Sequence, residues 1–226
     1  MPRSGILYAS SAVLFQLKER LGGRFAPEVV KPYTLSAAHK TQGDFCRIRF
    51  TELVEHSLSP IIDELLTSGQ ALPVSRADND VRGTSYEHLL QDADRFQRTA
   101  ILQFSSPTII DFGGYSVPFP VLPLMLSSYL HLWNAFARLE IPRAAELLRH
   151  IKMRDFKCSC VRSTHGPGFQ GWVTMEMDKG RSEEEIRAFN VLIDFAFYCG
   201  TGLHTEEGLG QTGRAKGHGL TSKAKG

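Results

Sequence analysis

The chain has 226 residues, of which 42% are hydrophobic and 22% are charged, and this is the composition of an ordinary globular protein. The length allows one large domain or two smaller ones, each able to bury a core. Because the formal net charge is only +2, no strong overall field indicates a nucleic-acid partner. The longest apolar stretch, residues 119–136, contains Pro120, Pro123, His131 and Asn134, which argues against a membrane-spanning helix of about 20 apolar residues.

The first half of the chain predicts an α-β-β-α series. Its members are an amphipathic helix, a short extended segment, an alternating strand and a second helix, at residues 6–21, 31–36, 44–52 and 56–67. In the alternating strand, period two places Cys46, Ile48 and Phe50 on one face and Arg47 and Arg49 on the other. Polar, loop-like sequence follows over residues 70–96, apart from a short helix near residues 86–90.

The second half predicts a β-α-(α)-β-β-α series. Its members are at residues 99–104, 119–139, 142–151, 154–162, 169–177 and 183–198. Ser182 and Glu185 have the spacing of a capping box at the start of the last helix. A glycine-rich segment, Cys199–Gly219, follows this helix directly.

Two similar halves predict an α+β fold made of tandem ferredoxin-like βαββαβ units. The first unit would lack its first strand, because the chain starts almost at the first predicted helix. The predicted organisation is an N-terminal unit at residues 1–96, a C-terminal unit with the glycine-rich loop at residues 97–213, and a basic flexible tail at residues 214–226.

The four cysteines, Cys46, Cys158, Cys160 and Cys199, form no CxxC pair, and no His/Cys cluster has zinc spacing. They are interpreted as reduced thiols of a cytoplasmic protein, and neither a metal nor a cofactor is expected. The first eleven residues lack a sustained apolar core after their charge, so no signal peptide is predicted.

The glycine-rich segment holds seven glycines. It is neither a dinucleotide fingerprint nor a P-loop, because a helix precedes the glycines and no GK[ST] sequence follows. One interpretation is a linker in which Gly200 caps the preceding helix. The other is a loop whose main-chain N–H groups meet phosphates, since glycine permits close approach and positive φ.

Four stretches together resemble a known family. They are Lys31–Ser36 with the strand at residues 45–53, then Leu102–Thr108, then Gly168–Trp172, and finally Tyr198–Gly202 with Gly208–Gln211. Their order and spacing resemble the CRISPR-associated endoribonucleases that cut precursor CRISPR RNA within its repeats, and the likeness spans roughly residues 31–211.

The resemblance implies tandem ferredoxin-like units that bind a repeat stem-loop or a single-stranded repeat. It implies a metal-independent cut in which the ribose 2′-OH attacks the adjacent phosphate and leaves a 2′,3′-cyclic phosphate and a 5′-OH. A histidine commonly acts as the general base in this family, and a lysine, tyrosine or arginine stabilises the phosphorane. Members often keep their product and join other subunits of a CRISPR effector complex, with no membrane involved.

The catalytic assignment departs from the family pattern. The usual catalytic histidine precedes the segment that matches Lys31–Ser36, but residues 25–30 contain no histidine. Imidazole titrates near neutrality, and His39 is the predicted general base or acid, with Lys31 balancing charge on the phosphorane. His204 is the second candidate. A chain that has lost catalysis and only holds RNA is the alternative.

The predicted RNA-binding residues combine basic side chains with the glycine-rich loop. Arg47 and Arg49 share a strand face that suits adjacent phosphates, although charged residues also protect solvated edge strands. The full predicted set is Lys40, Arg47, Arg49, Lys157, Gly200, Thr201, Gly202, His204, Gly208, Gly210, Gln211, Arg214 and Lys216.

Three functions remain open from the sequence. The first is an endoribonuclease that processes CRISPR RNA, and the second is a non-catalytic subunit of a ribonucleoprotein. The third is a metabolic enzyme of ferredoxin-like fold with a small-molecule pocket. Phosphate contacts predict RNA affinity that falls steeply as salt rises, whereas the metabolic enzyme predicts no such affinity.

Overall fold

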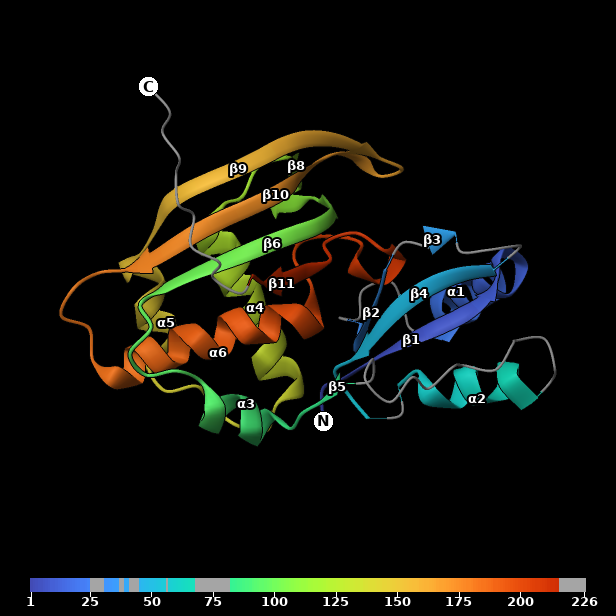
Figure 1. Cartoon of the computed structure of the whole chain (residues 1–226), viewed down its shortest axis with the longest axis horizontal. Coiled ribbons are helices and arrows are strands. Elements are labelled where there is room, and N and C mark those ends of the chain that lie inside the picture. The colour runs from blue at the N-terminus through green and yellow to red at the C-terminus, as the bar shows by residue number, and fades with distance from the viewer. Residues whose placement is uncertain (25–30, 37–38, 41–44, 56, 68–81, 216–226) are drawn as a thin grey trace, which may run out of the picture.

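The computed structural model of the chain describes residues 1–24, 31–36, 39–40, 45–55, 57–67 and 82–215. These residues form two units that lie side by side, each built from an antiparallel sheet with helices packed on one face (Figure 1). Lys216, the remainder of the predicted tail, and residues 70–81 of the predicted loop lie outside the described residues. No helix in the described part of the chain is long and apolar enough to cross a bilayer.

The first unit has the strand order β2-β4-β1-β5, with the short β3 beside β4. Its elements are β1 (Arg3–Ser10), α1 (Ser11–Arg24), β2 (Tyr33–Leu35), β3 (His39–Lys40), β4 (Phe45–Glu52), α2 (Ser59–Thr67) and β5 (Arg82–Gly83). All its strand pairs are antiparallel. Apart from the added β3, this is the βαββαβ arrangement of a ferredoxin-like fold. One core, which includes Leu7, Leu17, Ile48 and Leu58, joins the sheet to both helices.

The prediction that this unit lacks its first strand is wrong. β1 spans Arg3–Ser10 and pairs with β4 along its whole length, and the helix begins only at Ser11. The physical reason is that β1 is covered on both faces: Ile6, Leu7 and Ala9 are all buried. A strand covered on both faces has a continuous apolar run rather than alternation, and such a run merges with the periodicity of a following helix.

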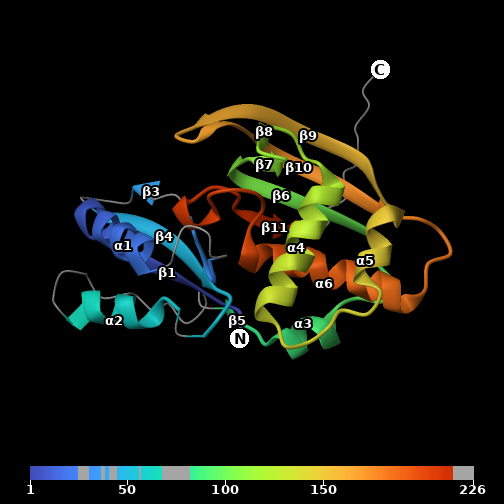
Figure 2. The same cartoon turned by 180° about the vertical axis from the view of Figure 1, so that it is seen from behind.

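The second unit repeats the order, as β11-β6-β10-β9. Its strands are β6 (Thr99–Thr108), β7 (Ile110–Phe112), β8 (Tyr115–Val117), β9 (Ile151–Ser163), β10 (Gly166–Met177) and β11 (Thr212–Arg214). Its helices are α3 (Tyr86–Asp92), α4 (Leu122–Phe136), α5 (Ala144–Leu147), the 3-10 turn η1 (Leu148–His150), α6 (Glu183–Cys199) and the 3-10 turn η2 (Thr205–Glu207). α4 and α6 lie under the same face of the four-stranded sheet (Figure 2). The α+β fold with tandem ferredoxin-like units is confirmed.

α6 is the central helix of this unit. The predicted capping box is present, since the Ser182 side chain accepts from the Glu185 amide while the Glu185 carboxylate accepts from the Ser182 amide. The helix ends at Gly200, which has φ of 69°. A side chain is strained at such a φ, so Gly200 lets the chain turn sharply into the glycine-rich loop. This loop runs back under β6 and ends in β11, which the sequence analysis did not predict.

α3 packs with the second unit and also bonds to the end of β4 in the first. The Tyr86 ring lies 5.0 Å from the Trp133 ring in an edge-to-face contact, and the Tyr86 hydroxyl donates to the Leu53 carbonyl at 2.9 Å. The Arg187 side chain on α6 donates to the Leu90 carbonyl at 2.5 Å. A domain boundary near residue 96 stays a prediction.

Candidate nucleic-acid interface

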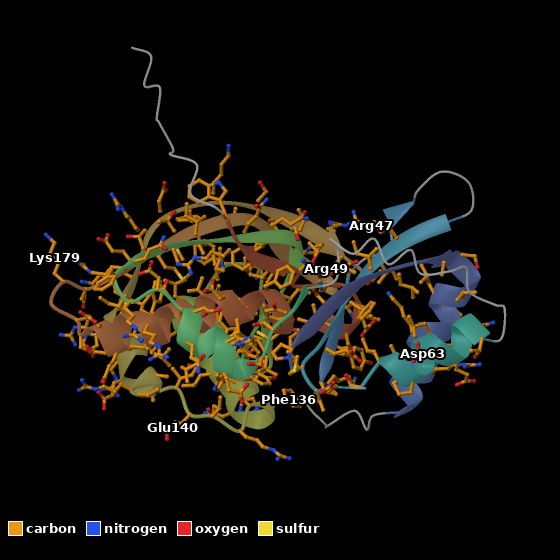
Figure 3. The ribbon with its side chains drawn as sticks, turned by 60° about the horizontal axis from the view of Figure 1, so that its bottom comes forward. Arg47, Arg49, Asp63, Phe136, Glu140 and Lys179 are labelled. Atoms are coloured by element: carbon orange, nitrogen blue, oxygen red, sulfur yellow. The ribbon has the colours of Figure 1, made fainter. Side chains whose placement is uncertain are left out.

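A pocket of about 430 Å³ lies where the two sheets meet. The first unit contributes Ser36, Arg47 and Arg49, and the second contributes Ser105, Ser106, Pro107, Gln170 and Gln211. Figure 3 shows Arg47 and Arg49 on β4 at the side that faces the second unit. As predicted, Cys46 and Ile48 on the same strand point into the core. The pocket therefore combines two guanidinium groups with hydroxyl and amide side chains.

Arg49 is held in place by neutral groups. Its guanidinium donates to the Gln211 side-chain oxygen and lies 4.6 Å from the centre of the Phe197 ring. Burial, and then the neighbouring Arg47 charge, lower the pKa of Arg49. An amide and an aromatic ring do not cancel the positive charge, so Arg49 presents an oriented cation to the pocket.

Gln211 connects the two units through both its side chain and its main chain. Its side-chain nitrogen donates to the Leu35 carbonyl at 3.0 Å. Its amide donates to the Ser106 hydroxyl at 2.9 Å, and its carbonyl accepts from the Ser105 amide at 2.8 Å. Gln211 is buried, with 4% exposure. This predicted RNA-binding residue therefore fixes the position of Arg49 relative to β6.

The glycines of the loop serve close main-chain packing. A Cβ atom on Gly202 would lie 2.1 Å from the Ile109 oxygen, and one on Gly210 would lie 2.0 Å from the Thr201 oxygen. Both glycines have positive φ, 80° and 64°. Gly208 also has positive φ, of 110°.

Several main-chain N–H groups of the loop already have partners inside the protein. Thr201 donates to Gly210, Leu203 donates to Ile109, and Gly210 donates to Pro107, each at 2.9 Å. These three amides are therefore not free to meet phosphates in this conformation. They do not contribute to the anion-binding role predicted for the loop. The glycines instead let the loop approach the β6–β7 junction closely.

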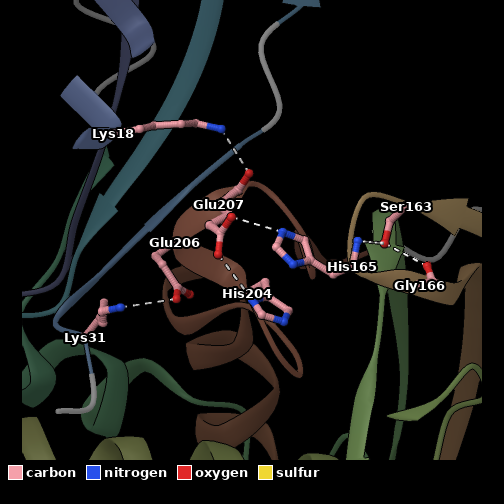
Figure 4. A network of polar contacts seen from close by, with 8 residues as sticks. All are labelled: Lys18, Lys31, Ser163, His165, Gly166, His204, Glu206 and Glu207. Atoms are coloured by element: carbon pink, nitrogen blue, oxygen red, sulfur yellow. Dashed lines mark hydrogen bonds and ion pairs between the residues drawn. The ribbon is translucent and has the colours of Figure 1, made fainter. Parts of the chain in front are cut away.

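A second polar cluster lies at the outer turn of the loop (Figure 4). Glu207 contacts two histidines: its Oε1 lies 3.2 Å from His204 Nδ1, and its Oε2 lies 3.0 Å from His165 Nε2. The two imidazole rings are stacked, with centres 3.8 Å apart. Lys31 pairs with Glu206 at 3.5 Å, and Lys18 donates to the Glu207 main-chain oxygen at 3.1 Å.

The two predicted catalytic residues lie at opposite ends of β4. His39 on β3 is opposite Arg47, whereas Lys31 precedes Tyr33, which is opposite Glu52. Five strand positions separate these partners, which corresponds to about 17 Å at roughly 3.3 Å per residue. His39 is therefore opposite one arginine of the pocket, and Lys31 contacts the loop that carries His204.

The other predicted residues lie in different environments. Lys157 is exposed on β9, opposite Trp172. Arg214 pairs with Asp194 at 2.9 Å and also donates to the Asn190 side chain. Thr201 is buried and shares hydrogen bonds with the Tyr129 and Thr212 hydroxyls. Lys40, on β3, is opposite Cys46 of β4.

Sequence reasoning missed several residues of the two sites. Ser105, Ser106 and Gln170 line the arginine pocket, and His165 belongs to the second cluster. The two serines lie inside the strand motif that carried the family resemblance, so that motif offered a signal for them. His165 offered none, because 39 positions separate it from His204.

Comparison with known proteins supports the family resemblance. The family model for the CRISPR-associated endoribonuclease Cas6 matches residues 102–212, which form most of the second unit. The resemblance drawn from the sequence motifs is thereby confirmed, and this part of the chain is similar to the Cas6 family. Among curated protein sequences, none matches this chain.

Solved structures extend the likeness to the whole fold. A Cas6 from Thermus thermophilus is 23% identical with a TM-score of 0.71, and covers 95% of this chain and 98% of its own. Two Cas6 product complexes match at 24% and 22% identity with TM-scores of 0.75 and 0.74. They cover 95% and 96% of this chain, and 99% and 100% of their own chains. At this identity the likeness shows the fold of both units, including the first, which the family model does not reach.

Proposed function

We propose that this chain binds the repeat stem-loop of precursor CRISPR RNA and cuts it without a metal ion, leaving a 2′,3′-cyclic phosphate and a 5′-OH. The observation that carries the proposal is the pocket between the two units, where Arg47 and Arg49 lie beside hydroxyl and amide side chains. The match to an endoribonuclease family and the fold shared with Cas6 product complexes support it.

The pocket has the chemistry to hold a sugar–phosphate backbone. Arginine forms paired, charge-assisted hydrogen bonds to phosphate oxygens. Side chains such as those of Ser36 and Gln170 bond to phosphate and ribose groups, which position the RNA. Lys157, exposed on β9, would contact the stem.

The cleavage step needs one group to remove a proton and another to stabilise charge. The base takes the proton of the 2′-OH, the 2′ oxygen bonds to phosphorus, and the bond from phosphorus to the 5′ oxygen breaks as that oxygen gains a proton. His39 is the proposed base, because β3 places it opposite Arg47. His204, on the loop that Lys31 contacts through Glu206, is the second candidate.

Cleavage of repeat RNA in the presence of a chelator tests the proposal. The wild-type chain is expected to give a cyclic-phosphate product, and the His39→Ala variant is expected to lose most of the rate, since general acid–base catalysis contributes about 10²–10⁴-fold. The matched control is His88→Ala, a histidine on α3. Loss in His204→Ala but not in His39→Ala would move the base to the second cluster. No cutting by the wild-type chain would overturn the enzymatic proposal.

A catalytically inactive RNA-binding subunit is the second candidate function. The observation that favours it is the absence of histidine from residues 25–30 of the sequence. With this function, the chain would bind repeat RNA tightly and leave it intact. It would be recovered from the cytoplasm with other subunits of a CRISPR effector complex. Binding without cutting in the chelator experiment would decide for it. The Cas6 family match disfavours the metabolic-enzyme alternative.

A further inference from the structure

Two histidines and a glutamate converge at the tip of the glycine-rich loop. His165 comes from the turn between β9 and β10, and His204 and Glu207 come from the start and end of η2. One ligand atom from each residue lies within 4.8 Å of the others. Residues from two segments far apart in the sequence thus present two imidazole nitrogens and a carboxylate to one point (Figure 4).

The spacing of these atoms is close to that of a metal site. Zinc binds nitrogen and oxygen ligands at about 2.0–2.1 Å, so neighbouring ligands of a tetrahedral ion lie about 3.4 Å apart. The two contacts to Glu207, at 3.0 Å to Oε2 and 3.2 Å to Oε1, are close to this spacing, so the carboxylate would bind the ion through both oxygens or turn to offer one of them. The two imidazole nitrogens need to approach each other by at most about 1.4 Å. Both rings are partly exposed, so a tilt of the rings achieves this.

The two lysines near this cluster do not contact the Glu207 carboxylate, which contacts the two histidine rings. Lys31 pairs with Glu206, and Lys18 bonds to the main-chain oxygen of Glu207, so neither contact uses that carboxylate. Since Lys31 offsets the charge of Glu206, Glu207 supplies the carboxylate that would attract a cation to the two rings.

The ligand types select the class of metal. Two imidazoles and one carboxylate suit zinc and neighbouring transition metals, whereas Mg²⁺ and Ca²⁺ prefer oxygen ligands only. Three protein ligands leave one position for water.

We propose that His165, His204 and Glu207 bind a divalent transition-metal ion, with zinc as the best fit, which cross-links the β9–β10 turn to the glycine-rich loop. The site goes beyond the proposed cleavage, which uses no metal, and it stands whether or not the chain cuts RNA. The expected consequence is a more rigid turn at residues 163–166.

The test is a titration of the metal-free full chain with zinc chloride, followed by calorimetry and, with cobalt as a substitute, by visible absorption. We expect one ion per chain. The His165→Ala, His204→Ala and Glu207→Gln variants should each bind roughly tenfold more weakly or worse, since removal of even an outer partner of a metal ligand costs about 10–100-fold. Thermal melts without metal verify that each variant folds.

The matched control is His150→Ala. His150 also contacts a carboxylate, that of Asp178 at 3.5 Å, but Lys152 already pairs with the same carboxylate at 2.5 Å. This variant should bind zinc as the wild type does. Amide hydrogen exchange at residues 163–166 should slow on adding zinc to the wild type and not to His204→Ala. No zinc binding, undiminished binding by His165→Ala, or an equal loss in His150→Ala would each overturn the proposal.

Discussion

The two units share one strand order but use it differently. In the first unit, β2 and β5 are short and β4 carries Arg47 and Arg49 to the junction. In the second unit, the 12- and 13-residue strands β10 and β9 and the 17-residue helix α6 form a larger body, and its glycine-rich loop reaches toward the first unit. The comparison teaches that the first unit supplies charge to the candidate site while the second supplies the rigid support that aims it.

The largest expected effect is a loss of stability in the second unit, whose glycine-rich loop supports the candidate site. Gly210→Ala should lower the free energy of unfolding by about 3 kcal/mol, because the new Cβ overlaps the Thr201 oxygen and the residue keeps a left-handed φ. Urea denaturation measures the change. The control is Gly113→Ala, which shares the positive φ but has open space around the new Cβ, and which should cost only about 1 kcal/mol. Equal losses would mean that close packing at Gly210 is unimportant.

The next effect concerns the charge supplied by the first unit. Arg49→Lys should weaken binding of repeat RNA more than Arg47→Lys does. Lysine cannot reproduce the planar contacts with Gln211 and Phe197, whereas Arg47 is exposed. We expect a loss of about 1.5–3 kcal/mol for Arg49→Lys, the worth of a charge-assisted hydrogen bond. Equal affinities of the two variants in a gel-shift assay would contradict the fixed orientation of Arg49.

A smaller effect tests the contact between the units. The buried Thr51 hydroxyl donates to the Tyr198 carbonyl at 2.6 Å, so Thr51→Val should cost about 1–2 kcal/mol in urea denaturation. Thr67→Val removes a hydroxyl that bonds within exposed α2 and should cost less than about 0.5 kcal/mol. If Thr51→Val is as mild as its control, the hydrogen bond does not hold the units together.

The smallest effect concerns the start of α6. The pKa of Glu185 is lowered chiefly by the hydrogen bond from the Ser182 amide, and burial opposes this in part. A carboxyl group with a lowered folded-state pKa stabilises the protein above its unfolded pKa, and the effect is lost as the pH falls through the folded pKa. The stability difference between wild type and Glu185→Gln should therefore be present at neutral pH and shrink below about pH 4.3, the ordinary glutamate pKa. Glu183→Gln, outside the capping box, should show no such pH dependence.

The sequence predicted the second unit well because its signals are local. The capping box at Ser182 acts within a few residues and is present, and the strands expected at residues 154–162 and 169–177 lie within β9 and β10. β1 was misassigned because its apolar run carries no alternation. The short strand β11 gains its place only by pairing with β6, more than 100 positions earlier.

The candidate site was predictable only in part for the same reason. The alternation of β4 placed Arg47 and Arg49 on one face correctly. The role of Gln211 depends on contacts to Leu35 and Ser106, which are 176 and 105 positions away. The glycines of the loop were expected to admit a ligand, but their neighbours are main-chain atoms of residues such as Ile109. No local pattern reveals such contacts.

The central claim is that the pocket between the units binds an RNA backbone through Arg47 and Arg49. The most direct measurement is the salt dependence of repeat-RNA affinity for the wild type and for the double variant Arg47→Gln, Arg49→Gln, with thermal melts to verify folding. Each lost phosphate contact should reduce the slope of log K against log salt by about 0.7–0.9. The account predicts a reduction of about 1.4–1.8 for the double variant, and an unchanged slope in a folded protein would contradict it.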